Sequence, residues 1–176
     1  MAGRLSALPR GSTGTVTFAF ETRDIGHPRD LAGFVVPRRE DRLVSGVSFA
    51  DRKFEGRAAE GTAVLRAFVD ERGLALDDDA LAVRVLTELA RWLALRPGAL
   101  PRARRVVRWP DAMPHYEVGH LDRVREAGDQ AAQWPGLLLA GHSYQGVGLP
   151  DCIRDGERAA EAAWARTGEP VGRPRD

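Results

Sequence analysis

The first part of the chain carries short apolar runs with the spacing of β-strands. Runs rich in β-branched and aromatic residues alternate with turns that contain glycine, proline and charged residues. These runs are Thr15–Phe20, Gly33–Val36, Leu43–Phe49 and Ala63–Val69. Short strands separated by turns of this kind predict an antiparallel sheet.

After Leu76 the hydrophobic period becomes that of an amphipathic helix. Asp77 is suited to cap its first turn, and Pro97-Gly98 ends the pattern. The positions that fall on one helical face are Leu81, Val85, Leu89 and Trp92 or Leu93. One apolar stripe predicts a helix that packs on a core and leaves its other side in water.

Two further strands and two further helices complete the predicted order. They are a strand at Arg104–Arg108, a helix at His120–Gln133, a strand that begins at Leu137, and a helix opened by Pro150 and Asp151. The second half therefore reads αβαβα, and the fold class is mixed α/β. We expect residues 1–75 to form the sheet domain, residues 76–166 a second domain, and residues 167–176 a disordered tail.

The loop before the last helix holds the most informative residues. Gly146 and Gly148 lack a Cβ where a ligand must approach the main chain, and the helix that follows offers unpaired N–H groups. Such groups favour a phosphate or the N1/C2=O edge of a reduced flavin. A complete Rossmann motif is not predicted, because Asp151 replaces its third glycine and about ten residues follow the helix. The alternative is an ordinary glycine-rich loop between a strand and a helix.

Four blocks of the sequence resemble one protein family. Leu138–Ile153 resembles the C-terminal flavin segment of oxygen-dependent protoporphyrinogen and coproporphyrinogen oxidases, within the flavin amine oxidase superfamily. Gly33–Glu40 resembles that family's GFLVPRRE block, Lys53–Gly61 its KFPGRAPEG block, and Arg108–His120 its RWPxAMPQYxVGH block. His115 and His142 depart from the residues usual in the family, which bears on substrate positioning.

The resemblance implies an FAD-dependent oxidoreductase of heme biosynthesis. It would oxidise a porphyrinogen, either coproporphyrinogen III or protoporphyrinogen IX, with O₂ as acceptor. The implied flavin-binding residues are the backbone of Gly146, Val147, Gly148 and Leu149, together with Trp109 packed near the ring. No catalytic acid or base is assigned. The early strands would then belong to a substrate domain, and the αβαβα part would complete an FAD-binding domain.

One departure limits this interpretation. Family members carry an N-terminal G-x-G-x-x-G unit for the adenosine diphosphate half of FAD, and residues 1–20 cannot supply it. Gly11–Gly14 is predicted to be a plain turn. The chain is therefore expected to be a C-terminal portion that binds FAD only with a complementary N-terminal polypeptide. The alternative is a non-catalytic fragment or remnant that does not bind flavin on its own.

The composition of the chain indicates few binding partners. The 26 basic and 25 acidic residues nearly cancel, so no charge-driven partner is implied, and the cluster Arg102, Arg104, Arg105 and Arg108 does not predict nucleic-acid binding. Cys152 is the single cysteine, and the four histidines have no metal-ligand spacing. No apolar run is long enough to span a membrane. We expect a cytoplasmic protein, with peripheral membrane contact left open.

Overall fold

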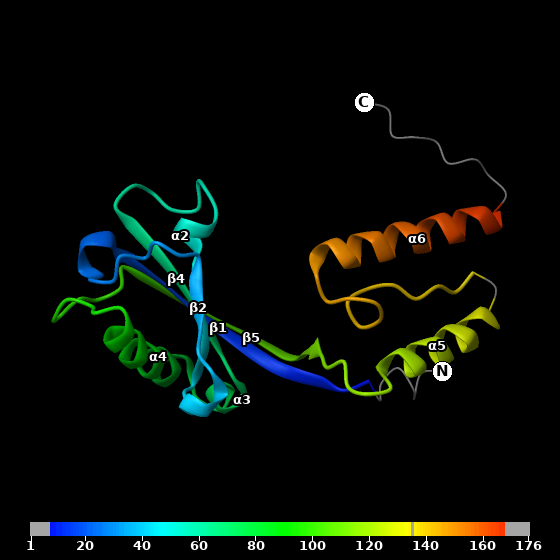
Figure 1. Cartoon of the computed structure of the whole chain (residues 1–176), viewed down its shortest axis with the longest axis horizontal. Coiled ribbons are helices and arrows are strands. Elements are labelled where there is room, and N and C mark those ends of the chain that lie inside the picture. The colour runs from blue at the N-terminus through cyan, green and yellow to red at the C-terminus, as the bar shows by residue number, and fades with distance from the viewer. Residues whose placement is uncertain (1–7, 135, 168–176) are drawn as a thin grey trace. The chain divides into compact units, whose positions relative to one another are not determined.

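The computed structural model describes residues 8–134 and 136–167. Its central feature is a five-stranded sheet with the order β2-β3-β4-β1-β5, drawn in Figure 1. The strands are β1 Arg10–Glu21, β2 Gly33–Val35, β3 Val44–Phe49, β4 Thr62–Val69 and β5 Ala103–Pro114. Strand β1 pairs with β4, β2 with β3 and β3 with β4, and these pairings are all antiparallel. The expected mixed α/β class with an antiparallel sheet is confirmed.

Helices of two lengths accompany the strands. The short ones are η1 Thr22–Asp24, η2 Arg38–Glu40, α2 Ala50–Lys53 and α3 Glu71–Leu74. The long ones are α4 Asp78–Trp92, α5 His120–Ala132 and α6 Leu149–Thr167.

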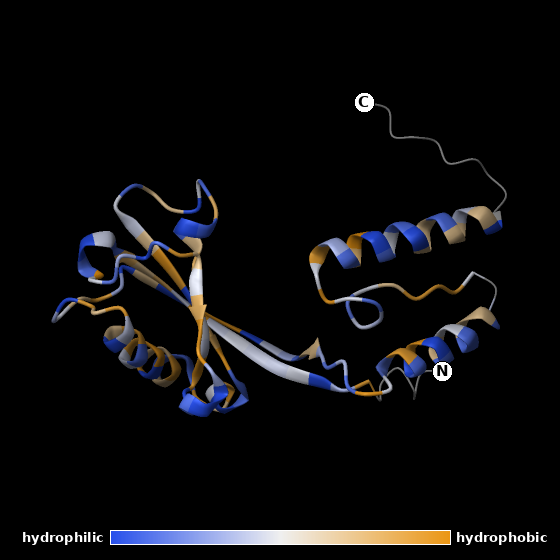
Figure 2. Cartoon of the chain, viewed as in Figure 1, coloured by the Kyte–Doolittle hydropathy of each residue, from blue (hydrophilic) through white to orange (hydrophobic). Residues whose placement is uncertain are grey.

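One face of the sheet forms the core with α4. The register sets Phe18 opposite Leu65, and Val16 opposite Ala67, so their side chains share a face. All four are almost completely buried. Helix α4 adds Leu81, Val85 and Leu89, and Leu93 at its C-terminal cap is buried in the same core, which confirms the predicted stripe. In Figure 2 α4 carries hydrophobic colour along one side.

Polar contacts fix α4 at both its start and its middle. The Asp77 carboxylate accepts the N–H of Ala80 at 2.8 Å, as its predicted capping role requires. Farther along the helix, Glu88 accepts the N–H groups of Leu43 at 3.2 Å and Val44 at 3.1 Å. This carboxylate therefore ties the start of β3 to α4.

A buried ion pair holds the loop that leads into β2. Arg29 contacts Asp51 at 2.7 Å, and their side chains are only 5% and 9% exposed. The second oxygen of Asp51 accepts the N–H of Val64 at 3.0 Å. Because the carboxylate is paired on both oxygens, its burial is compensated, and the loop is joined to α2 and β4.

The chain divides into two compact units at positions that the sequence did not predict. Residues Gly11–Met113 form one unit, and the described residues before and after that range form the other. The expected boundary between residues 75 and 76 falls inside the first unit, because α4 packs on the sheet that precedes it. We call these the sheet unit and the helical unit. The expected tail, apart from Thr167 at the end of α6, lies outside the described residues.

Two local predictions were wrong. Gly11–Gly14 is not a turn but part of β1, where Gly14 pairs with Val69. The segment that begins at Leu137 is not a strand within the described residues. No strand of the described residues pairs with it, and an apolar sequence alone does not make a strand. Since β5 joins the antiparallel sheet, the αβαβα order does not form a layer of its own.

Candidate functional site

The segment Gly141–Gly148, which we call the glycine loop, leads into α6 in the helical unit. The hydroxyl of Tyr116 holds this loop, because it donates one hydrogen bond and accepts another. Its O–H donates to the carbonyl of His142 at 2.7 Å, and its oxygen accepts the N–H of Gly146 at 2.9 Å. One side chain thus joins two points of the loop that are four residues apart.

His120, the first residue of α5, supports the same loop. Its ring stacks on Tyr116, with 3.8 Å between ring centroids and 15° between planes. Its Nε2 lies 3.1 Å from the carbonyl of Tyr144 and serves as the donor there. His120 is buried, so the stacked pair is a fixed support for the loop.

The side of the loop nearest α6 is held by charged groups of that helix. Asp155, which is buried, accepts the N–H of Gly141 at 2.8 Å. Arg158 forms an ion pair with Asp155 and donates to the side-chain oxygen of Gln145 at 3.0 Å. The loop is therefore anchored to both helices of its unit.

Both glycines singled out from the sequence face Asp151. A Cβ added at Gly146 would lie 2.6 Å from the Cβ of Asp151, and one added at Gly148 would lie 2.9 Å from its Oδ2. Gly146 also has a φ of +151°, which L-residues rarely adopt. The closest group to these glycines is thus a side chain of the same molecule, where the sequence analysis expected only a ligand.

The four predicted backbone positions of the loop lie together, but they are not equivalent. The N–H of Gly146 is used by Tyr116, whereas those of Val147 and Gly148 have no hydrogen bond to the described residues. Val147 and Leu149 have exposed side chains. Two adjacent N–H groups at the start of α6 therefore remain available to an acceptor.

Trp109 belongs to the other unit. It lies in β5, within the sheet unit, and its side chain is 42% exposed. Its predicted place beside a flavin stays a prediction.

Cys152 lies in the first turn of α6 and is half-buried. Its thiol lies 3.8 Å from the carbonyl oxygen of Gly146, so it contacts the glycine loop. In the described part of the chain, no three His, Cys, Asp or Glu side chains gather as a metal site. None of the described helices is both long and apolar enough to cross a membrane.

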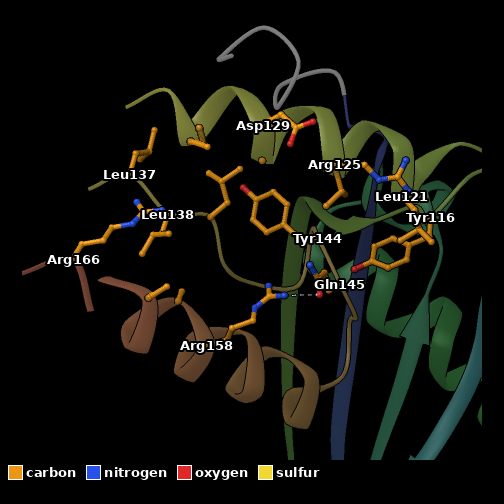
Figure 3. A pocket seen from close by; sticks show the side chains of 17 residues that line it. Tyr116, Leu121, Arg125, Asp129, Leu137, Leu138, Tyr144, Gln145, Arg158 and Arg166 are labelled. Atoms are coloured by element: carbon orange, nitrogen blue, oxygen red, sulfur yellow. Dashed lines mark hydrogen bonds between the residues drawn. The ribbon is translucent and has the colours of Figure 1, made fainter. Parts of the chain in front are cut away.

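A pocket of about 740 Å³ lies in the helical unit between α5 and α6. Leu137, Leu138 and Leu139 line it together with apolar or small residues of both helices, and Arg125, Asp129, Arg158 and Arg166 are its charged residues. Figure 3 shows Tyr144 and Leu138 between the two helices, and the contact of Arg158 with Gln145. The backbone of Leu138 and Leu139 has no hydrogen bond to the described residues. The pocket is thus lined by an apolar segment in which the main-chain groups of Leu138 and Leu139 have no partner among the described residues.

The sheet unit has an exposed apolar row on β2, β3 and β4. Val35 pairs with Gly46, and Gly46 pairs in turn with Phe68. Val35 is 83% exposed and Phe68 is 39% exposed, while Gly46 between them has no side chain. A shallow pocket of about 370 Å³ follows this row and includes Lys53. The row is therefore a hollow with apolar walls.

Charged pairs surround the sheet. Arg102, Arg104 and Arg108 of the predicted basic cluster pair with Glu21, Asp79 and Asp78. The hydrogen bond from Arg102 lowers the pKa of the Glu21 carboxyl. Hydrogen bonds to Asp41 and Asp70 raise the pKa of Arg72.

Sequence reasoning found the glycine loop but missed Tyr116, His120 and Asp155. Tyr116 and His120 are four residues apart inside the Arg108–His120 block, so the resemblance marked their segment without giving them a role. Asp155 carried no signal, because an acidic residue within a helix is ordinarily solvated.

Known proteins resemble the chain over nearly its whole length. It is 32% identical to coproporphyrinogen III oxidase of Bacillus subtilis, over 92% of this chain and 37% of the relative. It is 33% identical to coproporphyrinogen III oxidase of Staphylococcus aureus, over 86% of this chain and 33% of the relative. No protein-family profile matches the chain.

A solved structure agrees in fold. It is a crystal structure assigned to a protoporphyrinogen oxidase of Exiguobacterium sp. 255-15, with a TM-score of 0.79 and 32% identity. The match covers 94% of this chain and 37% of that one. The chain thus spans little more than a third of the length of the proteins it matches. Within that span, it belongs to the family of coproporphyrinogen and protoporphyrinogen oxidases.

Proposed function

We propose that the chain is the C-terminal portion of an FAD-dependent porphyrinogen oxidase of heme biosynthesis. The observation that carries the proposal is the glycine loop. It is anchored to α5 and α6, and the N–H groups of Val147 and Gly148 have no hydrogen bond to the described residues. A preformed pair of donors can stabilise negative charge without reorganising. The relatives supply the reaction class, since those described above are porphyrinogen oxidases by name.

Bound FAD would supply the two-electron redox chemistry of a porphyrinogen oxidation that uses O₂ as acceptor. The task of this chain would be to hold and orient. The N–H groups of Val147 and Gly148 would face the N1/C2=O edge of the ring, where negative charge gathers on reduction, and the first turn of α6 would add its dipole. Leu149 would contribute apolar contact, and Gly146 would act through its place in the loop.

The substrate would contact the sheet unit. The row Val35, Gly46 and Phe68 offers an apolar hollow, which suits the apolar surface of a porphyrinogen macrocycle. The sheet unit would then be part of the substrate domain, and the helical unit part of the FAD domain. The choice between coproporphyrinogen III and protoporphyrinogen IX is not made by these residues.

The helical unit also supports the need for a complementary N-terminal polypeptide. The backbone groups of Leu138 and Leu139 have no hydrogen bond to the described residues, and both residues line the pocket between α5 and α6. A β-strand added beside them would satisfy those groups and fill the pocket. We propose that a strand of the N-terminal polypeptide, the part that carries G-x-G-x-x-G, takes this place in the cytoplasm.

The test is complementation. The chain is co-expressed with the N-terminal two thirds of the Bacillus subtilis relative, the complex is purified, and porphyrin fluorescence is followed after addition of each porphyrinogen. We expect a yellow complex that forms porphyrin and consumes O₂, and a chain that retains no FAD when it is purified alone. FAD retained by the chain alone would refute the need for a second polypeptide. A stable complex that binds no FAD would instead favour the non-catalytic remnant.

A further inference from the structure

Tyr116 is the residue on which the contacts of the glycine loop converge. Its hydroxyl both donates and accepts, to His142 at 2.7 Å and from Gly146 at 2.9 Å. Its ring is 42% exposed, so burial of apolar surface does not account for its place. The hydrogen bonds of its hydroxyl and the stacking of its ring on His120 hold the residue in place.

The support behind Tyr116 makes the arrangement specific. His120 stacks on the ring and also donates to the carbonyl of Tyr144. Residues 142, 144 and 146 are therefore all bound by two adjacent rings. Since His120 begins α5, the carbonyl of Tyr144 is fixed to the first turn of that helix, and His142 and Gly146 are held by Tyr116 four residues before it.

We propose that Tyr116 is a positioning residue that sets which N–H groups of the loop face the flavin. Its hydroxyl takes the N–H of Gly146, and the next two N–H groups, of Val147 and Gly148, have no hydrogen bond to the described residues. Without the hydroxyl, both His142 and Gly146 lose a partner, and the loop is free to turn its donors away. The role toward the flavin rests on the proposed function, whereas the hold on the loop does not.

The first experiment measures the loop in the 176-residue chain without flavin. Tyr116→Phe keeps the stacked ring and removes the hydroxyl. Tyr144→Phe is the matched control, because the hydroxyl of Tyr144 has no hydrogen bond to the described residues. We expect amide exchange at Gly146, measured by NMR, to rise about tenfold in Tyr116→Phe, since one lost hydrogen bond corresponds to about 1.4 kcal/mol and a tenfold change. Amides of β4 and the control variant should be unchanged.

The second experiment uses the complemented, flavin-loaded enzyme. Tyr116→Phe should raise the Kd for FAD about tenfold and leave the KM for porphyrinogen unchanged, a division that a general loss of folding would not produce. Unchanged exchange at Gly146 would overturn the hold on the loop. Faster exchange with an unchanged Kd for FAD would overturn the positioning role. If the wild-type complex bound no FAD, the proposed function and the flavin role would both fail, and the exchange result would still decide whether Tyr116 holds the loop.

Discussion

Adding a methyl group at either glycine of the loop should have different consequences, although both face Asp151. Gly148→Ala would bring its Cβ to 2.9 Å from the Oδ2 of Asp151, the mobile end of a side chain, and otherwise only to ordinary contact. A rotamer shift relieves this at a cost of about 0.5–1.5 kcal/mol. Gly146→Ala would place its Cβ 2.6 Å from the Cβ of Asp151, which a rotamer change does not move.

The backbone adds a second cost at Gly146. Its φ of +151° lies in a region that alanine rarely adopts, at about 1–3 kcal/mol. Overpacking adds about 1–3 kcal/mol, so the sum is at least about 2 kcal/mol. That corresponds to a rise of about thirtyfold in the open fraction of the loop.

Removing the Asp151 carboxylate should distinguish Gly148→Ala from Gly146→Ala. Against a background of Asp151→Ala, Gly148→Ala should cost nothing further, because the group that it meets is gone. Gly146→Ala should still cost at least about 2 kcal/mol in the same background, because its φ and the Cβ of residue 151 both remain.

The assay is amide exchange at Cys152, whose N–H donates to the carbonyl of Gly148 at 2.9 Å. Labelling of the Cys152 thiol, the only one in the chain, gives an independent measure of opening. Gly156→Ala is the control, since a Cβ there meets nothing within 4 Å and should stabilise α6 by about 0.5–1 kcal/mol. Complete rescue of Gly146→Ala by Asp151→Ala would refute the reasoning, as would equal effects of the two glycine substitutions.

Three further predictions concern the sheet unit, each checked by urea unfolding. Asp77→Ala should cost about 1 kcal/mol by removing the cap of α4, and Asp77→Asn should retain it; equal losses would contradict the capping role. Leu89→Ala should cost about 2–5 kcal/mol, and Val83→Ala, which is 60% exposed, under about 0.5 kcal/mol; similar values would contradict the assigned face of α4. The pKa of Glu21 is lowered by Arg102, so its contribution is present above its ordinary pKa of 4.5 and is lost as pH falls through the lowered value. The stability difference between wild type and Glu21→Gln should therefore shrink from pH 6 to pH 4, and a difference that grows would refute the pairing.

The sheet and α4 were predictable because their patterns are local. Alternation in Thr15–Phe20 and the stripe through Leu89 report burial directly, and the cap at Asp77 depends on residues three apart. The boundary was not predictable in the same way. A change of period at Leu76 marks a change of secondary structure, and only packing shows that α4 shares a core with the strands before it.

The two wrong predictions, a turn at Gly11–Gly14 and a strand from Leu137, have different causes. Gly14 looked like a turn residue, but a Cβ there would lie 2.8 Å from the Leu74 side chain, so the glycine allows α3 to approach β1. The leucines after residue 136 looked like a strand, but no described strand lies beside them. A β-strand requires a neighbouring strand to hydrogen-bond with, and the described residues do not provide one for this segment.

The glycines predicted where the candidate site lies, but they did not predict which side chains hold it. Their spacing predicted a loop that approaches another group closely, and the group it approaches is Asp151. The role of Tyr116 depends on contacts with residues 26 and 30 positions away. Contacts over that separation have no periodicity, so only the folded chain shows which backbone donors are used and which remain.

A crystal structure of the flavin-loaded complex, formed with the complementary N-terminal polypeptide, tests the central claim most directly. The N–H groups of Val147 and Gly148 should lie about 3 Å from the N1/C2=O edge of the ring, with Tyr116 still bound to His142 and Gly146. A flavin bound elsewhere, or a glycine loop turned away from the ring, would contradict the account.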